Sequence, residues 1–183
     1  MKKYKLTNET IVHFGFTLYR IEALMDFSDV KAGDKGGFVQ SENNLSQLCN
    51  AWVYGNAKVY GNAKVYDNAK VFGNASVCGY ASVYDNASVY GNAEVRADAE
   101  VYGKAEVRGD AKVYKNSDYI VFKNWWSSGR YFTWTRSNKM WKVGCFYGNG
   151  KELIKKAYAD SEESGREYER VVKYVESILA DEF

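Results

Sequence analysis

The central part of the chain repeats one pattern of small, apolar and polar positions every six residues. From residue 51 to residue 116, each unit begins with alanine, places valine two residues later and ends with a Gly-Asn, Asp-Asn or related pair. So short a period indicates stacked coils that share one core. The valine position is kept in all eleven units, at Val53, Val59, Val65, Val71, Val77, Val83, Val89, Val95, Val101, Val107 and Val113.

A period of six favours strands over helices. An amphipathic helix repeats its apolar positions about every 3.6 residues, which six does not match, whereas Ala-x-Val alternates between two faces as a short strand does. Gly, Asn and Asp tolerate positive φ and therefore supply corners. One strand and one corner per unit close as a triangle, so three units make a coil of roughly 18 residues. We expect a parallel β-helix of three to four coils, with valine inside and alanine at the tight corners.

The repeat divides the chain into three predicted parts. Residues 1–50 form an N-terminal β segment that caps the first coil, residues 51–116 form the coils, and residues 117–183 form an α+β element. In the first part we predict the strands Lys3–Leu6, Ile11–Phe14 and Thr17–Ala23, and tight turns at Gly33, Gly36 and Gly37. In the last part we predict a hairpin with strands near Tyr131–Thr135 and Lys139–Phe146, turning at Ser137-Asn138, and helices over 151–160 and about 164–181.

The unit Val-Tyr-Gly-Asn-Ala-Lys resembles the hexapeptide-repeat family, whose motif reads aliphatic, x, x, x, small, x. That resemblance implies a left-handed parallel β-helix and a homo-oligomer, with a trimer favoured over a dimer. From DVKAGDKGGFVQSENNLS to KMWKVGCFYGNGKELIKKAYADSEESGREYERVVKYVE, the chain also resembles hexapeptide-repeat proteins of phages and prophages of Gram-positive bacteria. These are often labelled transferases from the fold alone, which is a weak basis for function. The second resemblance implies a phage protein in the bacterial cytoplasm and suggests an inhibitor of host antiviral defence.

Residues 18 positions apart are expected to stack in rows on the outside of the coils. The residue after each repeat valine is usually aromatic, so three of these rows consist largely of aromatic side chains. Stacked rings can serve simply to stabilise neighbouring strands. The alternative is contact with a subunit or partner, because three aromatic stripes exceed what a small monomer usually exposes. The rows are Tyr54, Phe72, Tyr90 and Arg108; Tyr60, Cys78, Arg96 and Tyr114; and our candidate interface, Tyr66, Tyr84 and Tyr102.

Composition narrows the function further. With 25 Lys and Arg against 23 Asp and Glu, the formal net charge of +2 excludes a protein that wraps nucleic acid through overall positive charge. No apolar run approaches a membrane span and no apolar region of a signal peptide follows MKKYKLTNET, so we expect a cytoplasmic protein without membrane contact. Sparse cysteines (Cys49, Cys78, Cys145) and a single histidine predict neither disulfides nor a metal site, and we expect no cofactor.

Residues 119–150 carry five bases, no acid and four of the five tryptophans. Guanidinium groups offer paired donors to phosphate, and indole rings stack on nucleobases. We therefore predict a site for an anionic nucleotide or nucleic-acid strand, with phosphate contacts from Arg130, Arg136 and Lys139 and stacking on Trp134 or Trp141. Two other readings remain: the tryptophans form the core of a small capping element, or the stretch binds a protein.

The leading hypothesis is a non-catalytic binding module that captures a host protein, a nucleotide or a nucleic-acid strand. The first alternative is an acyltransferase of the hexapeptide type, acting at a subunit boundary with His13 as the base. The resemblance implies a histidine base on a coil or a projecting loop, but no coil of this chain carries a histidine. The second alternative is a structural or virion assembly protein. The lack of a complete catalytic set in the sequence favours binding.

Overall fold

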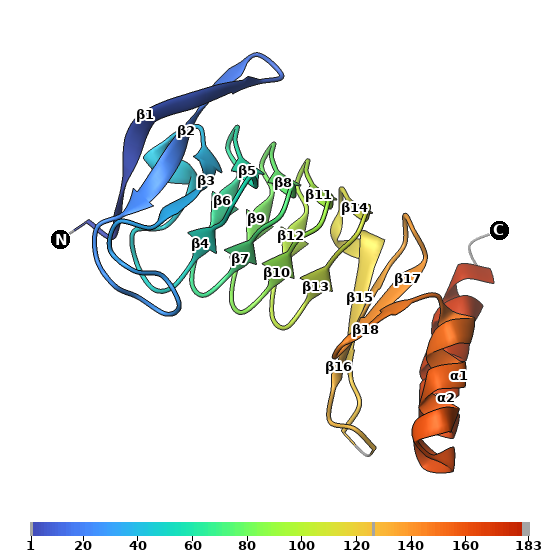
Figure 1. The fold of residues 1–183 in the computed structure, drawn as a ribbon. Coiled ribbons are helices and arrows are strands. Elements are labelled where there is room, and N and C mark those ends of the chain that lie inside the picture. The colour runs from blue at the N-terminus through green and yellow to red at the C-terminus, as the bar shows by residue number, and fades with distance from the viewer. Residues whose placement is uncertain (1, 126, 181–183) are drawn as a thin grey trace.

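The middle of the molecule is a parallel β-solenoid (Figure 1). The computed structural model describes residues 2–125 and 127–180. Val59 pairs with Val77 and Val77 with Val95, so each coil advances the chain by 18 residues and the predicted mainly β fold is confirmed. The coil strands are β4 (Trp52–Val53), β5 (Lys58–Val59), β6 (Lys64–Val65), β7 (Lys70–Val71), β8 (Ser76–Val77), β9 (Ser82–Val83), β10 (Ser88–Val89), β11 (Glu94–Val95), β12 (Glu100–Val101), β13 (Glu106–Val107) and β14 (Lys112–Val113).

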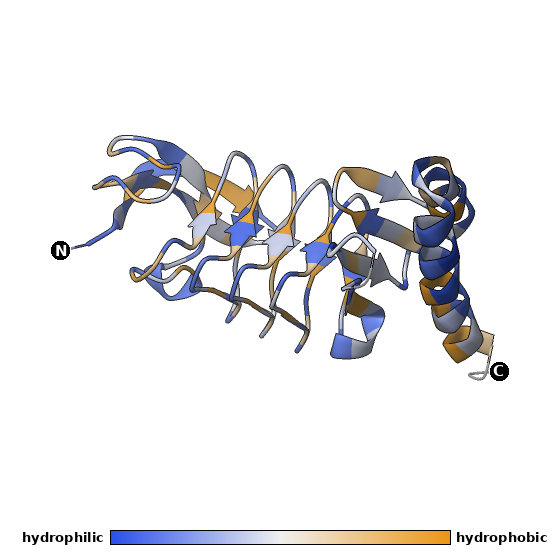
Figure 2. Cartoon of the chain, turned by 90° about the horizontal axis from the view of Figure 1, so that it is seen from below, coloured by the Kyte–Doolittle hydropathy of each residue, from blue (hydrophilic) through white to orange (hydrophobic). Residues whose placement is uncertain are grey.

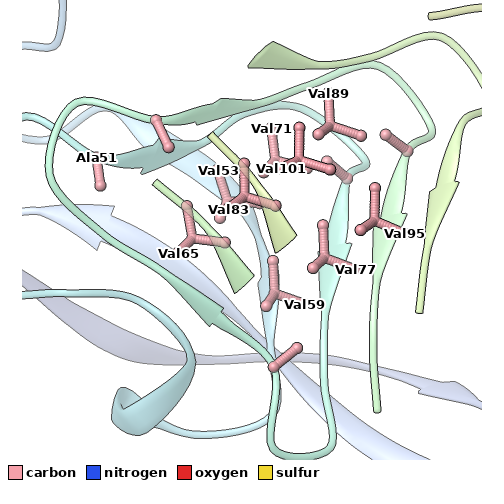
Figure 3. Packing of buried hydrophobic residues seen from close by; sticks show 14 of the residues in the cluster. Ala51, Val53, Val59, Val65, Val71, Val77, Val83, Val89, Val95 and Val101 are labelled. Atoms are coloured by element: carbon pink, nitrogen blue, oxygen red, sulfur yellow. The ribbon is translucent and has the colours of Figure 1, made fainter. Parts of the chain in front are cut away.

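These strands stack into three sheets that form the sides of the solenoid. The orders are β5-β8-β11-β14, β4-β7-β10-β13 and β6-β9-β12. The repeat valines point into the interior, where none is more than 1% exposed (Figure 3). Backbone bonds between coils hold the register, as in Lys64 N–H to the Ala81 carbonyl (2.9 Å) and Tyr66 N–H to the Val83 carbonyl (3.1 Å).

The corners of the coils need a left-handed backbone. Gly91 has φ +75°, and Asp67 and Asp85 adopt φ +56° at equivalent corners. The corners also stack closely, since a Cβ on Gly91 would lie 3.0 Å from the Gly109 nitrogen. Glycine therefore suits most corners for both conformation and space.

The solenoid begins before the first repeat. Its N-terminal part contains β1 (Tyr4–His13), β2 (Phe16–Ala23) and β3 (Lys35–Val39); β1 is one strand with a register shift, where the sequence predicted two. β3 pairs in parallel with β5, and Leu45 bridges Val65. Val39 and Leu45 thus occupy the position of the repeat valines in a coil that lies ahead of residue 51, and the short 3₁₀ helix Glu42–Asn44 lies between them.

Two of the three predicted turn glycines lie in a strand. Gly33 is in a turn with φ +91°, but Gly36 and Gly37 are buried in β3. A Cβ on Gly36 would lie 2.6 Å from the Val53 carbonyl oxygen, and one on Gly37 would lie 2.6 Å from the Ala57 carbonyl oxygen. These glycines are required because β3 packs directly against the first coil.

The buried Lys3 closes the N-terminal end of the solenoid. Its ammonium group donates to the carbonyls of Leu48 (3.3 Å), Cys49 (3.4 Å) and Ala51 (2.9 Å). Burial lowers the pKa of Lys3 to about 8, although the charge of Cys49 partly opposes this. One side chain therefore satisfies three carbonyls of the entering loop.

Side chains close the other end of the solenoid in place of a further coil. The N–H groups of the last strands, which in earlier coils donate to backbone carbonyls, here donate to side-chain oxygens. Glu100 N–H donates to Asn116 Oδ1 at 2.8 Å. Glu106 N–H donates to Thr133 Oγ1 at 2.9 Å. Asn116 begins the short 3₁₀ helix Asn116–Asp118, and Thr133 belongs to the C-terminal sheet.

The C-terminal element is a sheet covered by two helices (Figure 1). The predicted hairpin is present as β16 (Tyr131–Thr135) and β17 (Met140–Val143), but the sheet also contains β15 (Tyr119–Lys123) and β18 (Phe146–Gly148), in the order β15-β16-β17-β18. The second predicted strand is interrupted at Gly144, which has φ +52°. The predicted helices are α1 (Gly150–Asp160) and α2 (Glu162–Ala180), and residue 181 lies outside the described residues. Both helices carry hydrophilic residues over much of their surface (Figure 2).

The two faces of this sheet pack against different cores. On one face, Val121 packs on the solenoid core. On the other face, the cluster of Trp134, Trp141 and Phe132 packs on Leu153 and other helix residues. The sheet is therefore the layer that joins the solenoid to the helix pair.

We expect Gly91→Ala to destabilise the chain more than Gly103→Ala. Both glycines have positive φ, and a left-handed alanine costs about 1–2 kcal/mol. A Cβ on Gly103 would meet no atom within 4 Å, whereas a Cβ on Gly91 would press on the next coil, adding about 1–3 kcal/mol. Urea unfolding of both variants measures the difference. Equal losses would contradict the close stacking of corners.

The pH dependence of stability tests the role of Lys3. Its pKa in the folded state, about 8, is below its ordinary value of 10.5, so between these values the unfolded state binds more protons. The free energy of unfolding contributed by Lys3 must therefore rise with pH across this window. We expect the stability difference between the wild type and Lys3→Met to shift in favour of the wild type from pH 8 to pH 10.5. A difference that stays constant or shifts the other way would contradict this assignment.

Candidate binding surface

The predicted outward rows are present on the three sides of the solenoid. Phe72 stacks on Tyr90 with ring centroids 4.5 Å apart. Tyr66 stacks on Tyr84 at 4.9 Å with an interplanar angle of 5°, and Tyr84 stacks on Tyr102 at 5.3 Å and 12°. We call Tyr66, Tyr84 and Tyr102 the tyrosine row. The 18-residue register alone brings these side chains together, because each follows a buried valine of the same sheet.

The row on β4-β7-β10-β13 is covered at both ends by other parts of the chain. At the N-terminal end, Asp29 accepts from the Tyr54 hydroxyl (2.9 Å) and from the Lys70 ammonium (2.8 Å). The hydrogen bond from Lys70 is the largest cause that lowers the pKa of Asp29 to about 2. At the other end, the Arg108 guanidinium lies between the Tyr90 and Tyr147 rings, 5.4 Å and 4.9 Å from their centroids.

The row on β5-β8-β11-β14 is covered where the β1–β2 hairpin lies over it. Tyr60 is buried with Leu18 and Phe38. Further along, the Arg96 guanidinium lies 3.8 Å from the centroid of the Tyr114 ring. This row therefore also serves mainly to attach and stabilise the chain's own elements.

The tyrosine row is more open. Within the described part of the chain, the ring contacts of its members run along the row itself. Tyr66 and Tyr84 are half-buried by their neighbours and Tyr102 is 46% exposed. Burial, followed by the charge of Glu100, raises the pKa of Tyr84 to about 12, so the Tyr84 hydroxyl stays uncharged at physiological pH. The result is a stacked aromatic strip along one side of the solenoid.

A polar line runs beside the strip. Lys64, Ser82 and Glu100 occupy the position after alanine on β6, β9 and β12, and parallel pairing stacks them in this order. A basic, a neutral and an acidic side chain thus stack in succession beside the tyrosine row. At the N-terminal end, a groove of about 850 Å³ is lined by Lys64, Ser82, Tyr80, Asn62 and neighbouring residues. The surface therefore changes from basic to acidic along its length.

The residues predicted to form a nucleotide site in 119–150 are divided between the core and the surface. Trp134 and Trp141 are only 3% and 2% exposed, so neither offers a face to a ligand in this structure. They are buried because both lie on the sheet face that packs against the helices, opposite each other in register. The alternative reading, in which the tryptophans form a capping core, matches this burial.

The bases of the same stretch lie at opposite ends of β16. Arg130 precedes the strand and lies beside Gly144. Arg136 follows it and donates from Nε to the Ser117 carbonyl at 3.3 Å, while Lys139 is exposed in the β16–β17 turn. Five strand residues separate the two ends by roughly 17 Å. Lys142, which was not predicted as a site residue, forms an ion pair with Glu106 at 3.1 Å and thereby ties the sheet to the solenoid.

His13 lies next to the turn of the β1–β2 hairpin, away from the tyrosine row. Its ring is 4.5 Å from that of Phe14 and 5.3 Å from that of Tyr60. Burial, and secondarily the charge of Lys58, lower its pKa. The aromatic contacts account for its place in the hairpin, and its role as an acyltransferase base remains a prediction.

Among residues 2–125 and 127–180, no group of three or more His, Cys, Asp or Glu side chains could hold a metal ion. Neither described helix combines the length and hydrophobicity required to cross a bilayer. No protein-family model matches the chain, and a search of curated proteins finds no significant match. The fold thus defines the class, a β-solenoid with external aromatic rows and a sheet-and-helix cap.

We expect Trp141→Ala to destabilise the protein by about 3–5 kcal/mol, because it would leave a large cavity between the sheet and the helices. Trp125→Ala is the matched control, since Trp125 is 75% exposed and its loss should change stability by about 0.5 kcal/mol or less. Urea unfolding followed by circular dichroism measures both. Similar small losses would show that Trp141 is not a core residue.

Proposed function

We propose that this chain is a non-catalytic binding module that holds a protein partner on the tyrosine row. The observation that carries the proposal is the open, stacked row Tyr66, Tyr84 and Tyr102, next to two rows that the chain uses to attach its own elements. Aromatic side chains are enriched at protein interfaces, where they bury a large area. Rings that are already stacked on a rigid coil lose little conformational freedom when a partner binds.

The charge pattern supports a protein partner over nucleic acid. Lys64 lies near one end of the row and Glu100 near the other, so the surface has no continuous positive track. Nucleic-acid backbones require several neighbouring cations, and a mixed surface suits a protein of complementary pattern. A second copy of this chain is one such protein, and the homo-oligomer implied by the family resemblance remains a prediction.

The finer parts of the sequence-based hypothesis remain predictions from the resemblance. These are the phage origin, capture of a host factor, inhibition of host defence and a cytoplasmic location. A nucleotide would have to bind through exposed basic side chains alone, because Trp134 and Trp141 are buried. The acyltransferase and virion assembly alternatives also remain predictions, and no specific observation favours either of them.

A charged substitution in the row tests the proposal. We expect Tyr84→Glu to abolish retention of the bound partner from a cell extract, or to dissociate an oligomer of the chain itself, because it places a charge in the centre of an apolar contact. Light scattering and affinity capture measure these two effects. Tyr174→Glu is the control, since Tyr174 is a 56% exposed tyrosine of α2 that belongs neither to the row nor to the groove. Equal behaviour of the two variants would contradict the proposal.

A further inference from the structure

In the described part of the chain, the corner at Gly103 in the last coil has no atom close above it. In earlier coils the residue after a corner glycine donates its N–H to the next coil, as Asn74 does to the Gly91 carbonyl (2.8 Å). The corner at Gly109 is covered by the Tyr147 side chain, which occupies the position where a Cβ on Gly109 would lie. At Gly103, by contrast, an added Cβ would meet no atom within 4 Å. The corner Gly103-Lys104 is therefore the open end of the stack.

A cleft of about 450 Å³ lies at this corner, which we call the β15 cleft. Consecutive residues of β15 line it, although Val121 packs on the solenoid core and Ile120 on the helix cluster. Neighbouring strand residues that face opposite ways share a cleft only along the edge of the strand. The lining residues are Tyr102, Gly103, Lys104, Asn116, Tyr119, Ile120, Val121 and Tyr131.

The edge of β15 at this cleft has free backbone groups. β15 is the outermost strand of its sheet and pairs with β16 alone. Asn124 N–H donates to the Arg130 carbonyl (2.9 Å), and Arg136 N–H donates to the Asp118 carbonyl (2.8 Å). Hydrogen-bonded pairs alternate in antiparallel strands, so even-numbered residues of β15 face β16. The backbone groups of Tyr119, Val121 and Lys123 therefore point outward, and within the described chain none of their N–H groups has a backbone acceptor.

Charged side chains of both signs lie near the cleft, because the Asp85 carboxylate accepts from the N–H of Gly103 at 3.1 Å, but the one that lines the cleft is basic. Lys104 lines it and is exposed. Lys123 is exposed at the end of β15, with its ammonium 5.8 Å from the centroid of the Tyr131 ring. Of the described residues that line the cleft, none is acidic. The carboxylate of Glu100 lies instead within the tyrosine row, 3.4 Å from the Tyr84 hydroxyl.

We propose that an extended, acidic segment of a partner protein binds in the β15 cleft as an additional strand on β15. Main-chain bonds to Val121 and Lys123 would supply affinity, and Lys104 and Lys123 would select acidic side chains at alternate positions. Tyr102 and Tyr131, which are 46% and 39% exposed, would cover the apolar side chains of the segment. This inference rests on the proposed function, because it names the part of the partner that the chain holds.

Lysine on an edge strand is also a common guard against aggregation. A role of Lys123 in preventing aggregation and a role of the edge in peptide binding predict different results. If Lys123 only protects the edge, Lys123→Ala will increase self-association and no peptide will bind. If the edge is a binding site, the wild-type chain will bind peptide at the concentrations at which it is not aggregated.

The test uses an acetylated and amidated peptide of about eight residues in which valine and glutamate alternate. We expect calorimetric binding to the full chain and slower amide exchange at Val121 and Lys123. We expect a peptide with lysine in place of glutamate to bind at least about tenfold more weakly. Absence of binding up to about 1 mM, or equal binding of the two peptides, would overturn the proposal.

Two substitutions at position 123 isolate the contribution of the backbone N–H to peptide affinity. Lys123→Ala removes the charge and keeps the outward N–H, whereas Lys123→Pro removes both, and an edge strand tolerates proline where its N–H faces outward. We expect Lys123→Pro to bind the peptide about tenfold more weakly than Lys123→Ala. Equal affinities would rule out strand addition. If circular dichroism shows that Lys123→Pro does not fold, Lys104→Ala replaces it. The peptide should then bind Lys104→Ala more weakly, and the protection of the Val121 amide from exchange should fall together with this affinity.

The two proposals fail in different ways. If the peptide does not bind but partner retention depends on Tyr84, the β15 inference falls and the proposed function stands. If the peptide binds but Tyr84→Glu retains the partner, the tyrosine row is not the contact surface.

Discussion

Everything in this molecule depends on the stacking of one coil directly on the next. The buried valines fill the interior, and the carbonyls of Val59 and the later repeat valines accept from the preceding coil, as between Tyr84 N–H and the Val101 carbonyl at 3.0 Å. The parallel ladder allows no slip, because a shift of one residue would turn the valines outward. A fixed register therefore aligns every outward position into a row, and the surfaces of the protein follow from its core.

A stacked ladder has two ends, and its end groups have to be satisfied by other means. At the N-terminal end Lys3 donates to carbonyls of the entering loop, and at the other end Asn116 and Thr133 accept from the last strands. The corner at Gly103-Lys104 has an open position above it in the described structure. Closure of the ends thus explains both the capping elements and the place where the surface remains available to a partner.

The binding proposals use this rigidity in two ways. The tyrosine row offers a preformed apolar strip, since its rings already stack at 4.9 and 5.3 Å. The β15 edge offers main-chain groups whose direction is set by the sheet that joins the solenoid to the helices. Both depend on positions fixed by the fold, and neither requires a titrating group or a bound metal.

The sequence by itself determined the solenoid, because a strict six-residue period leaves one way to bury eleven valines. It also determined the aromatic rows, which follow from the 18-residue spacing, and the presence of the two helices. Only the tertiary structure decided which surface is open. Trp134 and Trp141 share the helix-facing side of the sheet, and that side was unknown until β15 and β18 completed the sheet around the predicted hairpin. The cover over two aromatic rows and the free edge of β15 likewise arise from contacts between segments far apart in the chain, for which no local pattern gives a signal.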